Sequence, residues 1–224
     1  MTLRCNNREF LFDDLSQEMF VRVLQDARRR FPIRLYNYCL MTNHVHLLFR
    51  VEHEDTLSKT MHWISTIFSH RFNRWRGRVG HLWQGRFRST IIEESTYFFR
   101  CMAYVDLNPL RAGIVASPSE YIWSGHRAVR EENAAHIDLH RLYLAAGADP
   151  AARYRFYCNL LAQELDREPV PLAETDFVGN GRFLATMRRR FQLDVSGASL
   201  RRKACGKGLF TLGPEHGGQR SKRR

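Results

Sequence analysis

The stretch that decides the fold is His44-Val-His-Leu-Leu-Phe-Arg-Val-Glu52. Its apolar side chains recur at every second position, at Val45, Leu47, Phe49 and Val51. This period of two predicts a half-buried strand that carries His44 and His46 together on its polar face. Two imidazoles side by side suit a divalent metal ion or a phosphate, although two exposed histidines without a ligand would give the same pattern.

A helix and a first strand are expected before this segment. In residues 13–31 the apolar residues recur at spacings of three and four, and Asp14 followed by Gln17 resembles a capping box, which together predict a helix. Residues 33–41 are typical of a strand, and the short polar break Thr42-Asn43 follows them. The strand, the break and the histidine segment predict an antiparallel hairpin.

Three further elements are expected over the next 50 or so residues. Helical spacing of apolar residues predicts a long amphipathic helix from Asp55, its expected cap, to Gly77. Residues 87–93 are expected to form a third strand, and residues 95–107 a third helix. That helix is expected to end at Asn108-Pro109, because the residue before a proline avoids helical geometry.

The remainder of the chain is expected to be helical and then basic. Helices are predicted over 154–165 and 183–191, separated by the break at Pro169-Val-Pro171. From about Ser196 the chain is rich in Gly, Lys and Arg and poor in apolar residues. We expect this segment to be a mobile tail that contacts nucleic acid without sequence preference.

Composition narrows the class of protein. The chain has 224 residues, of which 44% are hydrophobic, enough for a packed core. Its five cysteines are scattered without a Cys-x-x-Cys pair, so neither a disulfide framework nor a structural zinc site is expected. We find no signal-peptide pattern and no apolar run of about 18 residues, and therefore expect a soluble protein of a reducing cytoplasm.

The net charge of +12 is concentrated in two places. Residues 182–224 hold 12 Lys/Arg and 2 Asp/Glu, whereas residues 56–92 hold seven basic residues and no carboxylate. The basic residues of this second stretch are Lys59, Arg71, Arg74, Arg76, Arg78, Arg86 and Arg88. A patch of one sign favours a polyanion, with nucleic acid the leading candidate, although a solvated basic helix end is an equally simple explanation.

A possible nucleophile lies on the third predicted helix. Tyr104 and Asn108 are four residues apart, so a hydroxyl and a carbonyl oxygen share one helix face. A divalent ion bound by His44, His46 and Asn108 would leave open positions for a phosphate oxygen while Tyr104 attacks. Tyr104 could instead be a core aromatic, and Tyr97, seven residues earlier, is a rival on roughly the same face.

Four motifs resemble a known family. They are Tyr38-Cys-Leu-Met-Thr-Asn-His-Val-His-Leu-Leu48, Gly80-His-Leu-Trp-Gln-Gly-Arg-Phe87, Tyr104-Val-Asp-Leu-Asn-Pro-Leu-Arg-Ala-Gly-Ile-Val115 and Tyr121-Ile-Trp-Ser124. Together they resemble the REP-associated tyrosine transposases, a branch of the single-tyrosine HUH transposases, over about residues 4–126. The resemblance implies an α+β fold with a ferredoxin-like antiparallel sheet and helices packed on it. It also implies cutting and rejoining of single-stranded DNA beside small hairpins, with Mg²⁺ or Mn²⁺ and a 5′-phosphotyrosine intermediate.

The resemblance also implies roles for single residues. The family's metal-binding histidines fall on His44 and His46, its nucleophile falls on Tyr104, and Asn108 stands where the wider superfamily has an amide ligand. The arginines at 71, 74, 76, 78, 86 and 88 are expected to hold the DNA backbone, and Trp83 is expected to stack on unpaired bases. Trp75 could stack in the same way, but both tryptophans could instead be core residues, and for Trp75 a core position is favoured. No nucleotide cofactor is needed, because a phosphotyrosine link preserves the energy of the broken phosphodiester.

The sequence leaves alternatives for the activity and for the oligomeric state, and it also predicts how the chain is divided into domains. The protein could be a non-catalytic hairpin-binding descendant, and it could be a monomer or a homodimer. A histidine-triad nucleotide hydrolase is disfavoured because Leu48 stands where a further histidine is required. We expect a transposase domain over 1–126 whose first strand is shorter than usual in the family, a helical extension over 127–181 and a basic tail over 182–224.

Overall fold

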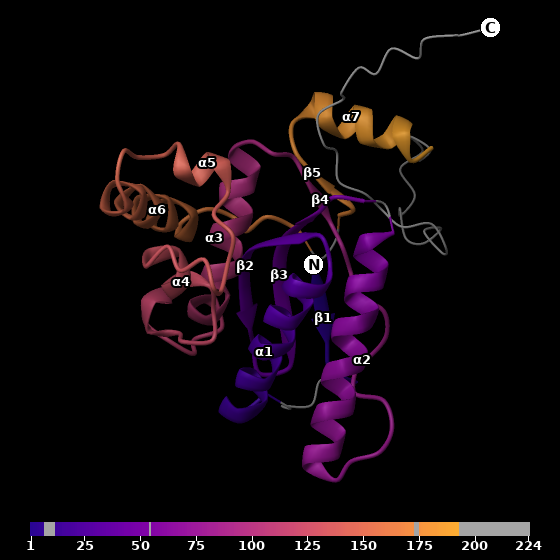
Figure 1. Cartoon of the computed structure of the whole chain (residues 1–224). Helices are drawn as coiled ribbons and strands as arrows, with labels where there is room; N and C mark the ends of the chain where they lie inside the picture. Colours follow the sequence, from indigo (N-terminus) through magenta and orange to yellow (C-terminus); the bar gives the residue numbers. More distant parts are fainter. Residues whose placement is uncertain (7–11, 54, 173–174, 193–224) are drawn as a thin grey trace, which may run out of the picture.

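The computed structural model describes residues 1–6, 12–53, 55–172 and 175–192. Its centre is a three-stranded antiparallel sheet with the strand order β1-β3-β2. These strands are β1 (Thr2–Arg4), β2 (Ile33–Leu40) and β3 (His44–Val51). Figure 1 shows the histidine strand β3 in the middle of the sheet, so the hairpin predicted from the sequence is confirmed.

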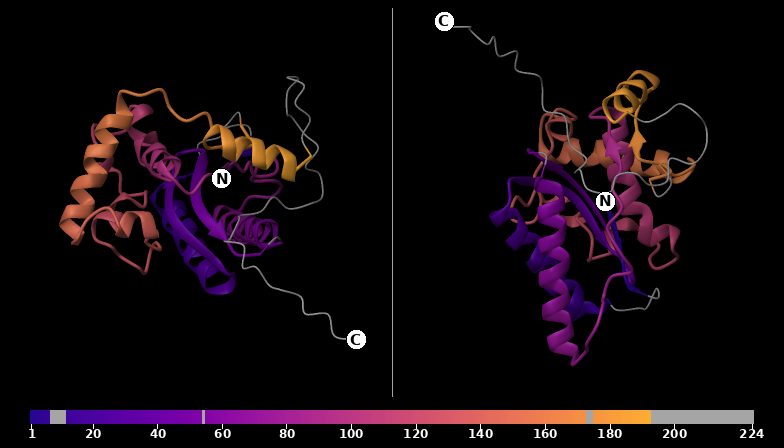
Figure 2. Two further views of the ribbon diagram at one scale, coloured as in Figure 1. Left: turned by 90° about the horizontal axis from the view of Figure 1, so that it is seen from above. Right: turned by 90° about the vertical axis from the view of Figure 1, so that its right-hand side faces the viewer.

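Helices cover both faces of this sheet. Helices α1 (Asp14–Arg30) and α2 (Thr56–Arg76) pack together on one face, and α3 (Thr96–Arg111) crosses the other face (Figure 2). Outside α3 lie α4 (His126–Arg130), α5 (Arg141–Leu144) and α6 (Pro150–Leu165). The expected α+β fold, with helices packed on an antiparallel sheet, is confirmed.

The predicted third strand is much shorter than expected. Over residues 87–93 only β4 (Ile91–Ile92) is a strand, and it pairs in parallel with β5 (Phe177–Val178) rather than with the central sheet. Arg88 nevertheless exchanges two backbone hydrogen bonds with Thr2, both of 2.9 Å, on the outer side of β1. Isolated β-bridges therefore stand in the place of the fourth strand of a ferredoxin-like sheet.

The predicted ends of the first two helices are close to those observed. Helix α1 is capped by Asp13 and Ser16, one residue before the predicted pair, because Gln17 is buried and its amide donates to the Leu40 carbonyl. Helix α2 begins after Asp55 as predicted, although the Asp55 side chain makes no capping hydrogen bond. It ends at Gly77, whose φ of 60° is the left-handed conformation that glycine adopts most easily.

Two predictions about the α3 face are wrong. Strand β3 is buried on both faces rather than half-buried, because α3 covers the side on which the histidines lie, and His46 is only 6% exposed. Helix α3 also continues through Pro109 to Arg111. Its last turn is held from outside, since the Arg111 guanidinium donates to the Glu164 carbonyl of α6, which offsets the hydrogen bond that proline cannot make.

The segment after residue 126 packs against helix α3. The predicted helices appear as α6 and α7 (Gly181–Arg190). Tyr157 of α6 is fully buried, and Glu164 pairs with Arg100 of α3 at 3.0 Å. The predicted tail from Ser196 lies outside the described residues, and no helix within the described ranges is long and apolar enough to cross a membrane.

Candidate active site

Strand β3 and helix α3 bring two histidines and a tyrosine together. The ring centroids of His44 and His46 are 4.8 Å apart, and the Tyr104 ring lies edge-on to His46 at 5.5 Å. Strand β3 fixes the two imidazoles on one face, and α3 crosses that face at Tyr104. The structure therefore unites three of the four residues predicted for catalysis and metal binding.

His44 is a neutral imidazole at physiological pH. Burial, with a smaller effect of the nearby Arg4 charge, lowers the pKa of His44 to about 4. Its Nδ1 lies 2.7 Å from the Asn43 side-chain oxygen, which fixes the orientation of the ring. A neutral imidazole oriented through one nitrogen is the usual form of a metal ligand.

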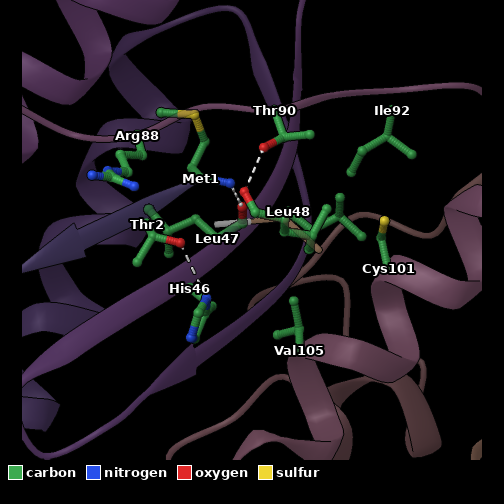
Figure 3. A pocket seen from close by; sticks show the side chains of 11 residues that line it. Met1, Thr2, His46, Leu47, Leu48, Arg88, Thr90, Ile92, Cys101 and Val105 are labelled. Carbon is green, nitrogen blue, oxygen red and sulfur yellow. Dashed lines mark hydrogen bonds between the residues drawn. The ribbon is translucent and has the colours of Figure 1, made fainter. Parts of the chain in front are cut away.

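His46 has a buried nitrogen that lacks a partner in the described part of the chain. Its Nδ1 lies 3.3 Å from the Thr2 hydroxyl, whereas its Nε2 is buried without a hydrogen bond (Figure 3). Burial first, and then the positive charges nearby, hold the pKa of His46 well below its ordinary value. A buried polar atom without a partner costs about 1–3 kcal/mol, and coordination of a metal ion would remove that cost. The residues present therefore fit a metal site.

Tyr104 keeps its proton at neutral pH. Burial raises the pKa of its phenol, and the positive charges of Arg111 and Arg4 oppose that rise. Attack on phosphorus requires the phenolate, so the proton must leave as the reaction proceeds. Positive charge beside the ring favours that loss.

Asn108 and Tyr97 lie outside the cluster that His44, His46 and Tyr104 form. The Asn108 side-chain amide donates to the Tyr104 carbonyl at 2.6 Å, so it is turned back along its own helix. Within the described ranges no cluster of three His, Cys, Asp or Glu side chains could hold a metal ion. Tyr97 stands two turns before Tyr104, and within the described part of the chain its ring contacts neither histidine.

A buried polar network two residues from the tyrosine was missed by the sequence analysis. Asp106 is 1% exposed and accepts hydrogen bonds from Tyr157 at 2.6 Å and from Asn37 at 2.8 Å. His126 Nδ1 lies 3.0 Å from the same carboxylate. These partners come from β2, α4 and α6, so the network fixes α3 against three elements. The sequence does contain one sign of this network, because Asp106 is a carboxylate between the apolar residues Val105 and Leu107.

The predicted DNA-binding arginines divide into two groups. The α2 group, Arg71, Arg74 and Arg76, lies on the far side of the sheet from Tyr104, followed by Arg78 just after the helix. Arg71 pairs with Asp26 at 3.3 Å, and Arg76 pairs with Asp13. Arg86 and Arg88 belong to the segment beside β1, and Arg88 lines the same pocket as His46 (Figure 3).

Trp83 and Trp75 lie in environments opposite to the ones expected from the sequence. Trp83 packs against Phe12, Phe20 and Phe68, and its indole nitrogen donates to the Ser65 carbonyl at 3.1 Å, so it belongs to the core. Trp75, expected in the core, is 40% exposed. The Arg76 guanidinium lies 4.2 Å above its ring, so the solvent-facing aromatic at this end of α2 is Trp75.

Known proteins resemble this chain in sequence and in fold. Residues 1–108 match the family model for IS200-like transposases. A protein of Haemophilus influenzae that bears the name of a REP-associated tyrosine transposase is 22% identical over 143 residues, which are 59% of this chain and 80% of the relative.

One solved structure shares the fold. It is described as a REP-associated tyrosine transposase bound to a REP hairpin, and it matches with a TM-score of 0.50 and 21% identity over 58% of this chain and 78% of its own. The resemblance to REP-associated tyrosine transposases is thus confirmed, and within it residues 1–108 match the model of the IS200-like transposases.

Proposed function

We propose that this protein is a metal-dependent transposase that nicks single-stranded DNA beside a hairpin and transfers the cut strand through Tyr104. The observation that carries the proposal is the convergence of Tyr104 with two neutral histidines, one of which has a buried nitrogen without a partner. A core tyrosine does not require neighbours of this kind.

His44 and His46 would hold the divalent ion, Mg²⁺ or Mn²⁺, with Asn108 as an oxygen ligand after its amide releases the Tyr104 carbonyl. The bound ion would supply positive charge to the phosphate oxygens as negative charge develops on them. Mixed nitrogen and oxygen ligands accommodate either metal. Thr2 and Asn43 would fix the tautomers of the two imidazoles through their Nδ1 atoms.

The Tyr104 oxygen would attack the phosphorus as its proton leaves. The bond between phosphorus and the 3′-oxygen breaks, a free 3′-hydroxyl departs, and the DNA 5′-phosphate stays linked to Tyr104. Because this link keeps the energy of the phosphodiester, a 3′-hydroxyl can attack it, reseal the strand and return the phenol. Tyr104 is half-buried, which would limit the access of water to the intermediate.

The charge of the chain and the solved relative support the proposed substrate class. The described chain has exposed arginines on α2, and a protein of the same fold has been solved with a REP hairpin. Folded DNA with a single-stranded flank would offer a duplex backbone to basic residues and a reachable phosphate to Tyr104. We therefore propose hairpin-bearing single-stranded DNA on the bacterial nucleoid as the substrate.

A denaturing-gel assay tests the proposal. Purified protein, Mn²⁺ or Mg²⁺ and end-labelled hairpin DNA are expected to yield a protein–DNA adduct with the wild type and with Tyr97→Phe, and none with Tyr104→Phe. Tyr97 is the matched control because it lies on the same helix. Binding of hairpin DNA without any adduct would establish the non-catalytic hairpin-binding protein instead.

A further inference from the structure

We propose that Arg4 is a catalytic residue that binds the phosphate attacked by Tyr104. The inference rests on the proposed function and adds a residue that the sequence motifs do not mark. It assigns to β1, the edge strand, a part in the chemistry as well as in the sheet.

The register of the sheet places Arg4 at the site. In the antiparallel pairing of β1 with β3, Arg4 stands opposite His44 and Thr2 stands opposite His46. Residues directly opposite in an antiparallel pair project from the same face with their Cβ atoms about 5 Å apart. The contact between the Thr2 hydroxyl and His46 Nδ1 at 3.3 Å confirms that shared face. Arg4 therefore extends beside His44 on the side that faces Tyr104.

The Arg4 guanidinium is available to a ligand. Arg4 is exposed, and within the described part of the chain its side chain takes part in no ion pair or hydrogen bond. In contrast, Arg111, the other arginine whose charge reaches Tyr104, donates to the Glu164 carbonyl. The Arg4 charge acts on His44, His46 and Tyr104 alike.

A guanidinium at this position suits the proposed reaction. The planar fork of an arginine matches two oxygens of a phosphate, and the phosphate gains negative charge as the tyrosine oxygen approaches. Two neutral imidazoles contribute no charge of their own. The positive charge at the site would therefore come from the proposed metal ion and from Arg4, and Arg4 would both hold the scissile phosphate and stabilise the transition state.

Three variants test the assignment. Arg4→Gln removes the charge, Arg4→Lys keeps the charge without the fork, and Arg34→Gln is the matched control. Arg34 lies on the same face but on the other edge strand, at the far end of the sheet, opposite Arg50. Thermal unfolding of each variant should match the wild type, since Arg4 makes no ion pair or side-chain hydrogen bond within the described residues and the Arg34–Glu52 pair at 3.9 Å is exposed.

The adduct is then measured under single-turnover conditions at saturating DNA. We expect Arg4→Gln to slow adduct formation about 10²–10³-fold, Arg4→Lys to slow it about 10-fold, and Arg34→Gln to leave it unchanged. Binding of hairpin DNA to the Tyr104→Phe background in EDTA should weaken less than tenfold on adding Arg4→Gln.

A substrate with an uncharged methylphosphonate at the cut position separates the scissile phosphate from its neighbours. If Arg4 contacts this phosphate, Arg4→Gln should slow cleavage of the modified substrate less than threefold, and the full effect should return when the methylphosphonate is moved one nucleotide away. An equal loss on all three substrates would overturn the assignment, as would an unchanged rate for Arg4→Gln. If the wild type forms no adduct with any substrate, the proposed function fails, and the role of Arg4 fails with it.

Discussion

The two faces of the central sheet differ in what they bury. The face under α1 and α2 is closed by apolar side chains such as Phe20, Leu47 and Phe68, and the aromatic rings there interlock at centroid distances of 4.9–5.7 Å. The face under α3 buries His46 and Asp106. The first face stabilises the fold through burial of apolar surface, and the second holds polar groups that need partners. The comparison predicts that the two faces can be altered separately.

The largest expected effect is a loss of activity. It is tested at His46 and Leu47, which are adjacent in β3 and face opposite sides of the sheet. His46→Leu should lower adduct formation by at least about 10³-fold, because it removes a ligand of the proposed metal site. The same variant should leave the free energy of unfolding in EDTA unchanged or higher by about 1 kcal/mol, because Leu replaces a buried nitrogen that has no partner. Urea denaturation and the single-turnover assay measure the two effects.

Leu47→Ala is the matched control on the opposite face. Leu47 is buried, and its truncation should lower the free energy of unfolding by about 2–5 kcal/mol. At a temperature where the variant remains folded, its adduct rate should stay within about threefold of the wild type. The comparison of the two faces fails if His46→Leu destabilises the protein as much as Leu47→Ala does.

The next effect concerns the network that fixes α3. Asp106→Ala should lower the free energy of unfolding by about 3–5 kcal/mol, because the hydroxyl of Tyr157 and the amide of Asn37 lose a buried acceptor. Asp26→Ala is the control, since Asp26 pairs with exposed arginines on α1 and α2 and should cost less than about 1 kcal/mol. Urea denaturation compares the two variants, and equal losses would show that the network is not structural.

Sequence periodicity located the elements, but it did not show what covers them. The strands of the hairpin, the extent of α2 and the helices α6 and α7 follow from local patterns that the structure keeps. The burial of His46 could not be predicted, because it depends on a helix that begins 50 residues later and crosses the same face. Helix α3 likewise passes Pro109 because Arg111 is held by α6, a contact between distant segments.

The candidate site was predictable in part for the same reason. The spacing of His44 and His46 on one strand is local, and the structure keeps it. Arg4 and Asp106 were not identified, since the first depends on the register of β1 against β3 and the second on partners from three elements. The predicted stacking residue Trp83 proved to be a core residue, because a tryptophan in a loop gives no local sign of which side packs.

Acid should lower the free energy of unfolding through the α3 face of the sheet, where the histidines lie, rather than through the apolar face under α1 and α2. His44 has a pKa of about 4 in the folded chain, whereas an unfolded histidine titrates near 6.5. The unfolded chain therefore binds the additional proton between pH 6.5 and pH 4, and the free energy of unfolding should fall over that interval by about 1–3 kcal/mol from this residue. Urea denaturation in EDTA at pH 7 and pH 4.5 measures the fall.

His44→Gln should remove that part of the pH dependence. The control His53→Gln changes an exposed histidine just beyond the end of the same strand and should leave the fall unchanged. If both variants keep the full fall between pH 7 and pH 4.5, the buried state of His44 does not contribute to it.

The smallest expected effect concerns the exposed arginines of α2, on the face opposite the site. Arg74→Gln should weaken binding of hairpin DNA about threefold to tenfold and reduce the slope of log affinity against log salt by about 0.7–0.9, because one phosphate contact is lost. Its rate of adduct formation at saturating DNA should equal that of the wild type, since α2 lies on the opposite face of the sheet from α3, the helix that carries Tyr104. Arg22→Gln, on the exposed side of α1, is the control. A slower rate for Arg74→Gln at saturation would mean that DNA held on α2 positions the scissile phosphate, and the two faces would then act together in the reaction.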